Sequence, residues 1–184
     1  MLDGDSAGSL SRRWAAISGK VLLAFVPLIA GCRSDVAQQD AITLARSKGA
    51  DVRISLKGDA LRVDLRRCRM DPELRAALQE MTAVESFLVS ADFSDADIDT
   101  VDSFPALKNL DLSHSKVSGS SFDRLMQLRL LEFLSLNGLT LSDADMDSVA
   151  RIRQLTSISV VDAKVSEDAL RRFRDTNPQC AIAQ

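Results

Sequence analysis

A repeat interval of 24 residues governs the second half of the chain. Segments that begin at Ser86, Leu110, Leu134 and Ile158 each start 24 residues after the previous one. In each segment an apolar residue follows seven places on, then a serine, then another apolar residue four places later. An earlier copy that begins at Val63 fits with one residue missing. Such periodicity predicts stacked copies of one small unit, because a single copy cannot bury its own apolar face.

Each repeat has the pattern of a short strand, a turn and a helix. The alternation of Leu110 and Leu112 places both side chains on one face of a strand. Apolar residues then return at helical spacing. The serine after the turn is predicted to be the N-cap of the helix, at Ser94, Ser118, Ser142 and Ser166. Stacking therefore predicts an α/β fold with a parallel sheet on one side and helices on a convex back.

The leucine spacing also resembles that of a known family. Leu107-x-x-Leu110-x-Leu112 and Leu131-x-x-Leu134-x-Leu136 resemble the leucine-rich repeat, and the nine residues from Leu110 are similar to a repeat of bacterial secreted and lipid-anchored proteins. The resemblance covers residues 61–175. It implies a solenoid of about 4–5 repeats, with a short parallel sheet on the concave side and helices on the convex side. The asparagine of that family's repeat is replaced by Ser115, Leu139 and Ala163, so those turns lack the usual asparagine ladder.

The flanking segments are expected to close the stack. Residues 36–48 predict a short helix, and the alternating segments 52–56 and 61–65 predict a hairpin around Lys57-Gly58-Asp59. We therefore interpret residues 32–60 as a tether and N-terminal cap, and residues 176–184 as the C-terminal cap. Cys68 and Cys180 are expected at opposite ends of the stack, about 20 Å apart, which exceeds the roughly 7 Å limit for a disulfide.

The first 32 residues have the pattern of a secretory signal. Arg12, Arg13 and Lys20 precede an apolar run over 21–30, which is shorter than the ~20 residues of a membrane-spanning helix. The run ends in Leu28-Ile29-Ala30-Gly31-Cys32, which resembles the bacterial lipobox. That resemblance implies that residues 1–31 are a lipoprotein signal peptide, that Cys32 carries the lipid, and that the protein is anchored in the cell envelope, at the outer membrane or periplasmic face. An uncleaved anchor helix and a core helix are the alternatives.

The composition argues against several classes of function. With a net charge of -3, the chain has no excess of basic residues for sequence-independent binding to nucleic acid. The chain has one histidine and contains no glycine-rich phosphate loop, metalloprotease helix or Cys-x-x-Cys pair. We therefore expect no enzyme activity, no cofactor, no metal site and no small-molecule substrate. His114 is expected to be an exposed loop residue at a strand exit that other repeats fill with Gly138 or Asp162; a catalytic base is the alternative.

Aspartate is unusually frequent and follows the repeat. Of 26 acidic residues, 21 are Asp and 5 are Glu, and Asp favours caps and turns. The clusters 95–99 and 143–147 look like calcium loops but lack the glycine and glutamate that an EF-hand requires. Capping of repeated helix starts explains these aspartates, and a weak divalent site is the alternative. Members at the expected helix starts are Asp71, Asp95, Asp97, Asp143, Asp145 and Asp168.

The open face of the sheet is the candidate binding surface. If Leu110 and Leu112 face the core, the alternating side chains face outward, and apolar residues on such a face often mark a partner site. The predicted face comprises Phe87, Val89, Asn109, Asp111, Phe133, Ser135, Asn137 and Val161. An unidentified protein partner is the favoured ligand. In the alternative interpretation, the phenylalanines only cover neighbouring residues of the same chain. A structural envelope lipoprotein with a self-associating or spacer role, and no dedicated ligand, is the alternative function.

Overall fold

The computed structural model describes residues 35–184. The predicted signal peptide and Cys32, the predicted lipid attachment site, lie outside the described residues. Residues 38–184 form one compact unit, an α/β fold built on a seven-stranded sheet whose spatial order, β1 to β7, equals the order along the chain. Within residues 35–184, no helix combines the length and the apolar character that crossing a membrane requires.

The strands are short and regularly spaced. The hairpin β1 (Asp51–Ile54) and β2 (Ala60–Asp64) is antiparallel, as the sequence predicts. All later pairs are parallel. These strands are β3 (Ser86–Leu88), β4 (Asn109–Asp111), β5 (Phe133–Ser135), β6 (Ser157–Ser159) and β7 (Ala181–Ala183).

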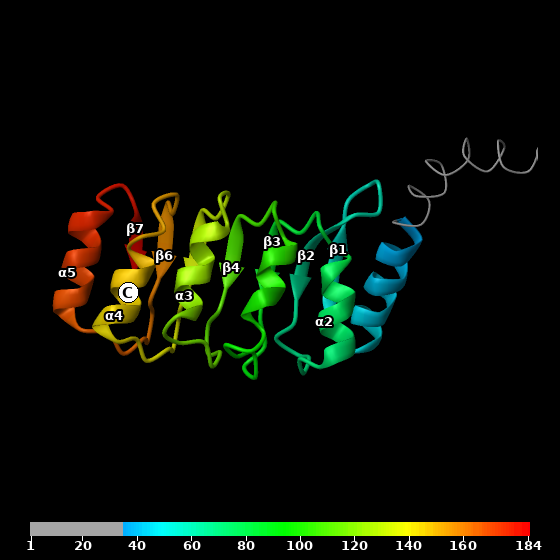
Figure 1. Ribbon diagram of the computed structural model, residues 1–184, viewed down its shortest axis with the longest axis horizontal. Coiled ribbons are helices and arrows are strands. Elements are labelled where there is room, and N and C mark those ends of the chain that lie inside the picture. The colour runs from blue at the N-terminus through cyan, green and yellow to red at the C-terminus, as the bar shows by residue number, and fades with distance from the viewer. Residues whose placement is uncertain (1–34) are drawn as a thin grey trace, which may run out of the picture. The chain divides into compact units, whose positions relative to one another are not determined.

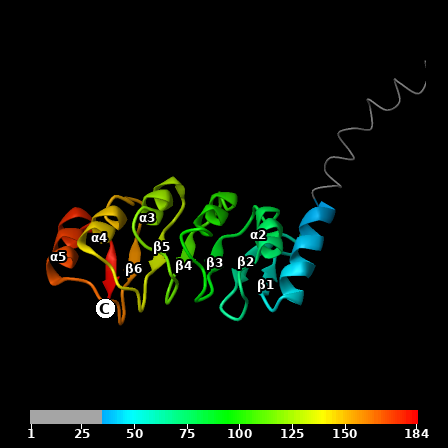
Figure 2. The same cartoon turned by 60° about the horizontal axis from the view of Figure 1, so that its bottom comes forward.

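The helices all lie on one face of the sheet, in chain order (Figures 1 and 2). A helix over 35–47 precedes the hairpin. The others are α2 (Pro72–Gln79), the 3-10 helix η1 (Ile98–Ser103), α3 (Ser121–Arg124) with the 3-10 helix η2 (Leu125–Gln127), α4 (Asp143–Val149) and α5 (Glu167–Thr176). From α2 to α5, the helical segments of consecutive repeats contact each other, so the repeats pack against one another in chain order.

The core lies between the sheet and the helices. One row of inward side chains runs through paired positions of five strands. All five residues are fully buried: Val63, Phe87, Leu110, Leu134 and Ile158. Phe87 packs edge-on against Phe93 and Phe104, with ring centroids 6.1 and 5.0 Å apart. Burial of such rings is a large favourable contribution to folding.

Phe87 and Val89 do not belong to the open face, and their predicted placement is wrong. Phe87 pairs with Leu110, which is 23 residues later, whereas the pairs before and after it are 24 residues apart. The turn from Val89 to Phe93 is one residue shorter than the turn from Leu112 to Val117. A one-residue change of register moves every side chain of a strand to the other face. Phe87 and Val89 are therefore core residues, 0% and 2% exposed.

Helix starts follow the predicted capping at three sites. Ser142 and Asp145 form a complete capping box at α4, and the Ser166 hydroxyl accepts from the Ala169 N–H at 3.1 Å. Asp71 caps α2 by accepting from the Leu74 N–H at 2.8 Å, with Pro72 in the first turn. These contacts satisfy backbone donors that a helix leaves unpaired.

The predicted N-caps Ser94 and Ser118 are wrong. Asp97 precedes η1, and Ser120 precedes α3. The Ser94 N–H and hydroxyl both donate to Asp97, at 3.0 Å each. The Ser118 N–H and hydroxyl donate to Asp95 of the preceding repeat, at 2.8 and 3.0 Å. Both hydroxyls are thus used by an aspartate, and the helical segments that follow are short or of the tighter 3-10 type.

Aspartates also connect consecutive repeats on the helical side. The Arg75 guanidinium pairs with Asp97, and Arg151 pairs with Asp123. Arg124 contacts Asp102 at 2.6 Å and Asp99 at 3.0 Å, and Arg172 contacts Asp143 at 3.1 Å and Asp147 at 3.2 Å. The aspartate excess therefore has a second origin besides capping, because an arginine of one repeat contacts an aspartate of a neighbouring repeat.

Candidate functional site

The open face of the sheet carries two outward rows of side chains. One row consists of Arg62, Ser86, Asn109, Phe133, Ser157 and Ala181, and the other of Asp64, Leu88, Asp111, Ser135, Ser159 and Ala183. Charged residues therefore lie on β2 and β4, whereas β6 and β7 present serine and alanine. The half of the face nearer β1 therefore carries the charged side chains, and the other half does not.

A hollow of about 400 Å³ lies on this face over β2 to β5. Arg62, Asn109 and Asp111 supply polar groups to its lining. Leu88 and the half-buried ring of Phe133 supply its apolar surface. The hollow thus combines a guanidinium, a carboxylate and an aromatic ring on rigid strands.

A second hollow of about 350 Å³ lies where the strands end, and its lining includes Arg66, Asp111, Ser113, His114 and Asn137. Asp111 lines both hollows. Its carboxylate accepts a hydrogen bond from the Ser113 N–H at 3.0 Å. Among residues 35–184, no arginine or lysine lies within ion-pair distance of Asp111. Its negative charge is therefore available to a ligand in either hollow.

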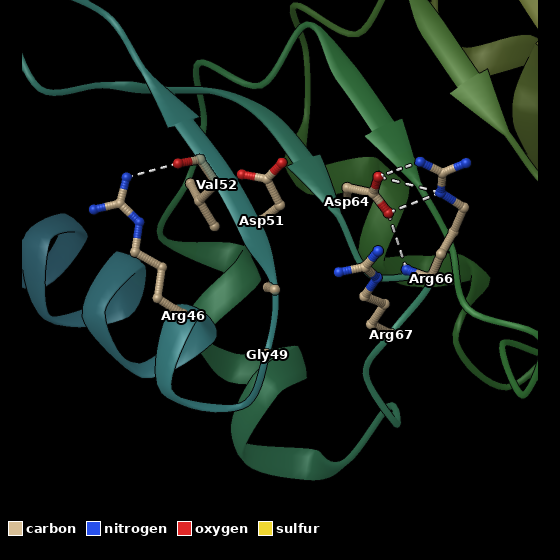
Figure 3. Close-up of a pocket in the computed structure, with 8 residues that line it drawn as sticks. Arg46, Gly49, Asp51, Val52, Asp64, Arg66 and Arg67 are labelled. Carbon is tan, nitrogen blue, oxygen red and sulfur yellow. Dashed lines mark hydrogen bonds and ion pairs between the residues drawn. The ribbon is translucent and has the colours of Figure 1, made fainter.

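A third hollow, about 790 Å³ and the largest of these three, lies beside β1 and β2 (Figure 3). Arg46 and Arg67 lie on opposite sides of the β1 ribbon (Figure 3). The Arg46 guanidinium donates to the Val52 carbonyl at 2.6 Å. No carboxylate lies within ion-pair distance of Arg67 in the described part of the chain. Arg66 lines this hollow and the second one, and we call the lining of all three hollows the recessed face.

A fixed ion pair stands at the centre of the recessed face. The Arg66 guanidinium forms a bidentate ion pair with the Asp64 carboxylate, with Nη2 to Oδ2 at 2.6 Å and Nε to Oδ1 at 3.0 Å. Its backbone N–H also donates to Asp64 at 3.0 Å. The hydrogen bond from Arg66 lowers the pKa of Asp64 despite partial burial, and Asp64 in turn raises the pKa of Arg66. Such a pair holds its geometry and presents little net charge.

The strand exits share a left-handed backbone residue, as the sequence suggests. His114, Gly138 and Asp162 occupy equivalent places with φ of 58°, 70° and 57°. A Cβ at Gly138 would overlap the Nδ1 atom of His114, so a larger residue here would displace the His114 ring, and glycine adopts the positive φ with the least strain. His114 is exposed at the rim of the second hollow.

Serine and asparagine side chains link the strands beyond β4. The hydroxyls of Ser113 and Ser135 are 2.8 Å apart. Asn137 Oδ1 accepts from the Ser159 hydroxyl at 2.7 Å and from the Val161 N–H at 2.8 Å. These groups are occupied by neighbouring strands, and Ser135 and Ser159 are buried. This part of the face is therefore held together by its own polar groups.

The predicted face residues divide into three groups. Asn109, Asp111 and Phe133 come together in one hollow, and Asn137 lines the second. Ser135 is buried, and Val161 is 37% exposed but lines none of the three hollows. Phe87 and Val89 are among the residues around the first and second hollows, respectively, but with 0% and 2% exposure they are core residues. Sequence reasoning missed Arg46, Asp51 and Arg67. Two local patterns could have indicated these residues. One is the arginine pair directly after the predicted strand 61–65, and the other is the end of the predicted helix directly before the segment 52–56.

The remaining reactive groups lie away from the recessed face or are occupied. Cys68 and Cys180 are buried free thiols, and burial raises the pKa of both. Asp95 accepts bonds from Ser118 and Ser121, and Asp143 accepts from Ser166 and Arg172. Residues 35–184 contain no group of three or more His, Cys, Asp and Glu side chains placed to hold a metal ion.

Comparison with known proteins gives little further information. No protein-family model matches the chain, and no curated protein matches it. One solved structure that it resembles is a Bacteroides fragilis protein determined as a structural genomics target, at 14% identity and a TM-score of 0.34. The match covers 56% of this chain and 43% of that one, so the chain spans less than half the length of that protein.

Proposed function

We propose that this chain is an exported leucine-rich-repeat protein, anchored to the cell envelope by a lipid on Cys32, that binds a protein partner through the recessed face. The solenoid assignment is supported by the 24-residue interval, by strands that follow one another in chain order, and by helices on a single face of the sheet. The anchor is supported by the lipobox resemblance at residues 28–32. In this proposal the chain is not an enzyme.

One observation carries the binding proposal. Arg62, Asp111 and Phe133 surround one hollow of about 400 Å³, on strands whose positions are fixed by the parallel ladder. Aromatic and arginine side chains are enriched among the residues that dominate protein interfaces. Because Asp111 forms no ion pair within residues 35–184, a partner that places a lysine or arginine there gains a charge-assisted hydrogen bond.

A partner-capture comparison tests this proposal. The double variant Asp111→Lys plus Phe133→Asp changes the charge and the apolar surface of the hollow. A matched control, Glu80→Lys plus Met126→Asp, makes the same changes at exposed positions on the helical side. We expect envelope proteins captured by the unaltered chain to be lost with the first variant and kept with the control. Equal recovery with both variants, each with an unchanged circular dichroism spectrum, would contradict binding through the recessed face.

The second candidate is a structural envelope lipoprotein that self-associates. The observation that favours it is the edge of the sheet at β7, which pairs only with β6 within the described residues. An open edge offers unpaired backbone groups to another chain. A molar mass that rises with protein concentration in light scattering, and falls after Ile182→Pro, is expected for this candidate. The recessed-face proposal instead expects a monomer.

A further inference from the structure

The turn between β1 and β2 is rigid. The Ser55 hydroxyl accepts from the backbone N–H groups of Lys57 and Asp59, both at 3.1 Å, and donates to the Asp59 carboxylate at 3.1 Å. The Ser55 N–H donates to the Asp59 carbonyl at 2.8 Å. Gln39 Nε2 donates to the Gly58 carbonyl at 3.1 Å, which ties the turn to the helix over 35–47. The turn therefore holds its neighbouring side chains in fixed directions.

This rigid turn presents apolar side chains to solvent. Leu56 is fully exposed, and Ile54 is 44% exposed. Turn positions are normally taken by Gly, Asn, Asp, Ser or Pro, so a fully exposed leucine is an unusual residue at this position. Arg53 and Lys57 flank these residues, are exposed, and form no ion pair within residues 35–184. We call Arg53, Ile54, Leu56 and Lys57 the hairpin tip.

The hairpin tip lies within reach of the proposed lipid anchor. Gln38 Nε2 donates to the Asp59 carboxylate at 3.3 Å, beside the Gln39 contact with Gly58. Cys32 precedes Gln38 by six residues, which span at most about 21 Å even when fully extended. A lipid on Cys32 would therefore hold the hairpin tip near the bilayer surface, and the span is shorter still because residues 35–38 belong to the helix over 35–47.

We propose that the hairpin tip contacts the membrane, with Leu56 entering the boundary between headgroups and acyl chains and with Arg53 and Lys57 against anionic headgroups. This inference rests on the proposed anchor at Cys32. Apolar side chains with basic neighbours bind such interfaces by combining buried apolar area with attraction to anionic lipid. The tip would also fix the direction in which the sheet leaves the membrane.

Fluorescence of an introduced indole tests the proposal. The full chain carries Trp14→Phe to remove its one tryptophan, together with either Leu56→Trp or, as a matched control, Leu130→Trp, where the native leucine is 50% exposed. Each protein is purified from bacterial membranes, checked for acylated Cys32 by mass spectrometry, and reconstituted into phosphatidylcholine vesicles with and without phosphatidylglycerol. We expect a blue shift and quenching by brominated acyl chains for Leu56→Trp and neither for Leu130→Trp.

The second part of the experiment removes the two positive charges of the hairpin tip. With Arg53→Gln plus Lys57→Gln, we expect binding of the Leu56→Trp chain to phosphatidylglycerol vesicles to weaken by roughly thirtyfold, and binding to pure phosphatidylcholine to stay the same. If Cys32 is acylated and the indole at position 56 is not quenched, the tip proposal is wrong while the anchor stands. If Cys32 is not acylated, the anchor is wrong, and quenching at position 56 with added vesicles still supports the tip. A blue shift that needs no vesicles and grows with protein concentration would instead identify a second copy as the occupant and overturn the membrane contact.

Discussion

Phe87 and Phe133 illustrate how the register of a strand decides the role of a residue. Both were expected on the open face, yet Phe87 is fully buried among Phe93 and Phe104, whereas Phe133 is half-buried at the hollow. We predict that Phe87→Ala lowers the free energy of unfolding by about 3–5 kcal/mol, and that Phe133→Ala lowers it by less than about 1 kcal/mol. Urea denaturation measures both. Similar losses for the two variants would contradict the 23-residue step between Phe87 and Leu110.

Thr100 offers a different test at a single position. Its side chain is buried, and its hydroxyl has no hydrogen-bond partner within residues 35–184. Because an unpaired buried hydroxyl carries a desolvation cost, we predict that Thr100→Val raises the free energy of unfolding by about 1 kcal/mol. Ser121→Ala is the matched control. The Ser121 hydroxyl donates to Asp95 at 2.6 Å, so this variant is expected to lose about 1–2 kcal/mol. A loss for Thr100→Val would mean that its hydroxyl finds a partner.

The turns that join the elements respond to acid through their aspartates. Partial burial acts to raise the pKa of Asp95, but hydrogen bonds from Ser121 and Ser118 outweigh it and lower the pKa overall. The hydrogen bond from Lys48 lowers the pKa of Asp71, and the bond from Ser166, with help from Arg172, lowers that of Asp143. A lowered pKa in the folded protein stabilises it above the unfolded value near 4, and that stability is lost as the pH falls further.

We therefore predict a melting temperature that stays level between about pH 7 and 5 and drops below about pH 4. In Asp95→Asn the melting temperature at neutral pH is lower and the further drop in acid is smaller, because one of the titrating carboxylates has been removed. Asp175→Asn, at an exposed aspartate outside these contacts, is the control. A full acid drop in Asp95→Asn would contradict a contribution from this carboxylate. Differential scanning calorimetry across the pH range provides the measurement.

The elements also indicate what sequence reasoning could and could not supply. The hairpin, the caps at Asp71, Ser142 and Ser166, and the helical side of the sheet follow from local patterns, because turn and capping chemistry is local. The register of β3 was missed because the missing residue lies in the turn after the strand. Turns have no regular spacing of apolar residues, so the sequence pattern does not locate a deletion there. Ser94 and Ser118 were misassigned because their hydroxyls bind aspartates, one in the same repeat and one in the preceding repeat.

At the scale of the whole molecule, the α/β sheet followed from the repeat, whereas the recessed face did not. Asn109, Asp111 and Phe133 were found because they alternate with core leucines along single strands. Arg46 and Arg67 come from segments about twenty residues apart. They share a hollow only because the first hairpin folds back on the preceding helix. Such a meeting depends on tertiary packing, which no local pattern reports.

Processing of the whole chain gives a further prediction. The sequence contains one tryptophan, Trp14, and no tyrosine. If the proposed signal peptide is removed between Gly31 and Cys32, the protein recovered from membranes has almost no absorbance at 280 nm, although its peptide absorbance near 205 nm is normal. Mass spectrometry of the N-terminal peptide identifies the acylated Cys32. Retention of tryptophan absorbance in the membrane-bound form would contradict cleavage at this site.

The order of the strands has a mechanical consequence. Because strand order equals chain order from β1 to β7, each inner strand is held in place by two neighbours, whereas the terminal strand β7 is held by one. We expect the chain to yield by peeling from β7, one repeat of about 24 residues at a time, each releasing about 80 Å of extended polypeptide. Held in an optical trap, the chain is expected to lengthen in a series of small steps at low force. It would therefore act as a compliant linkage instead of a brittle one.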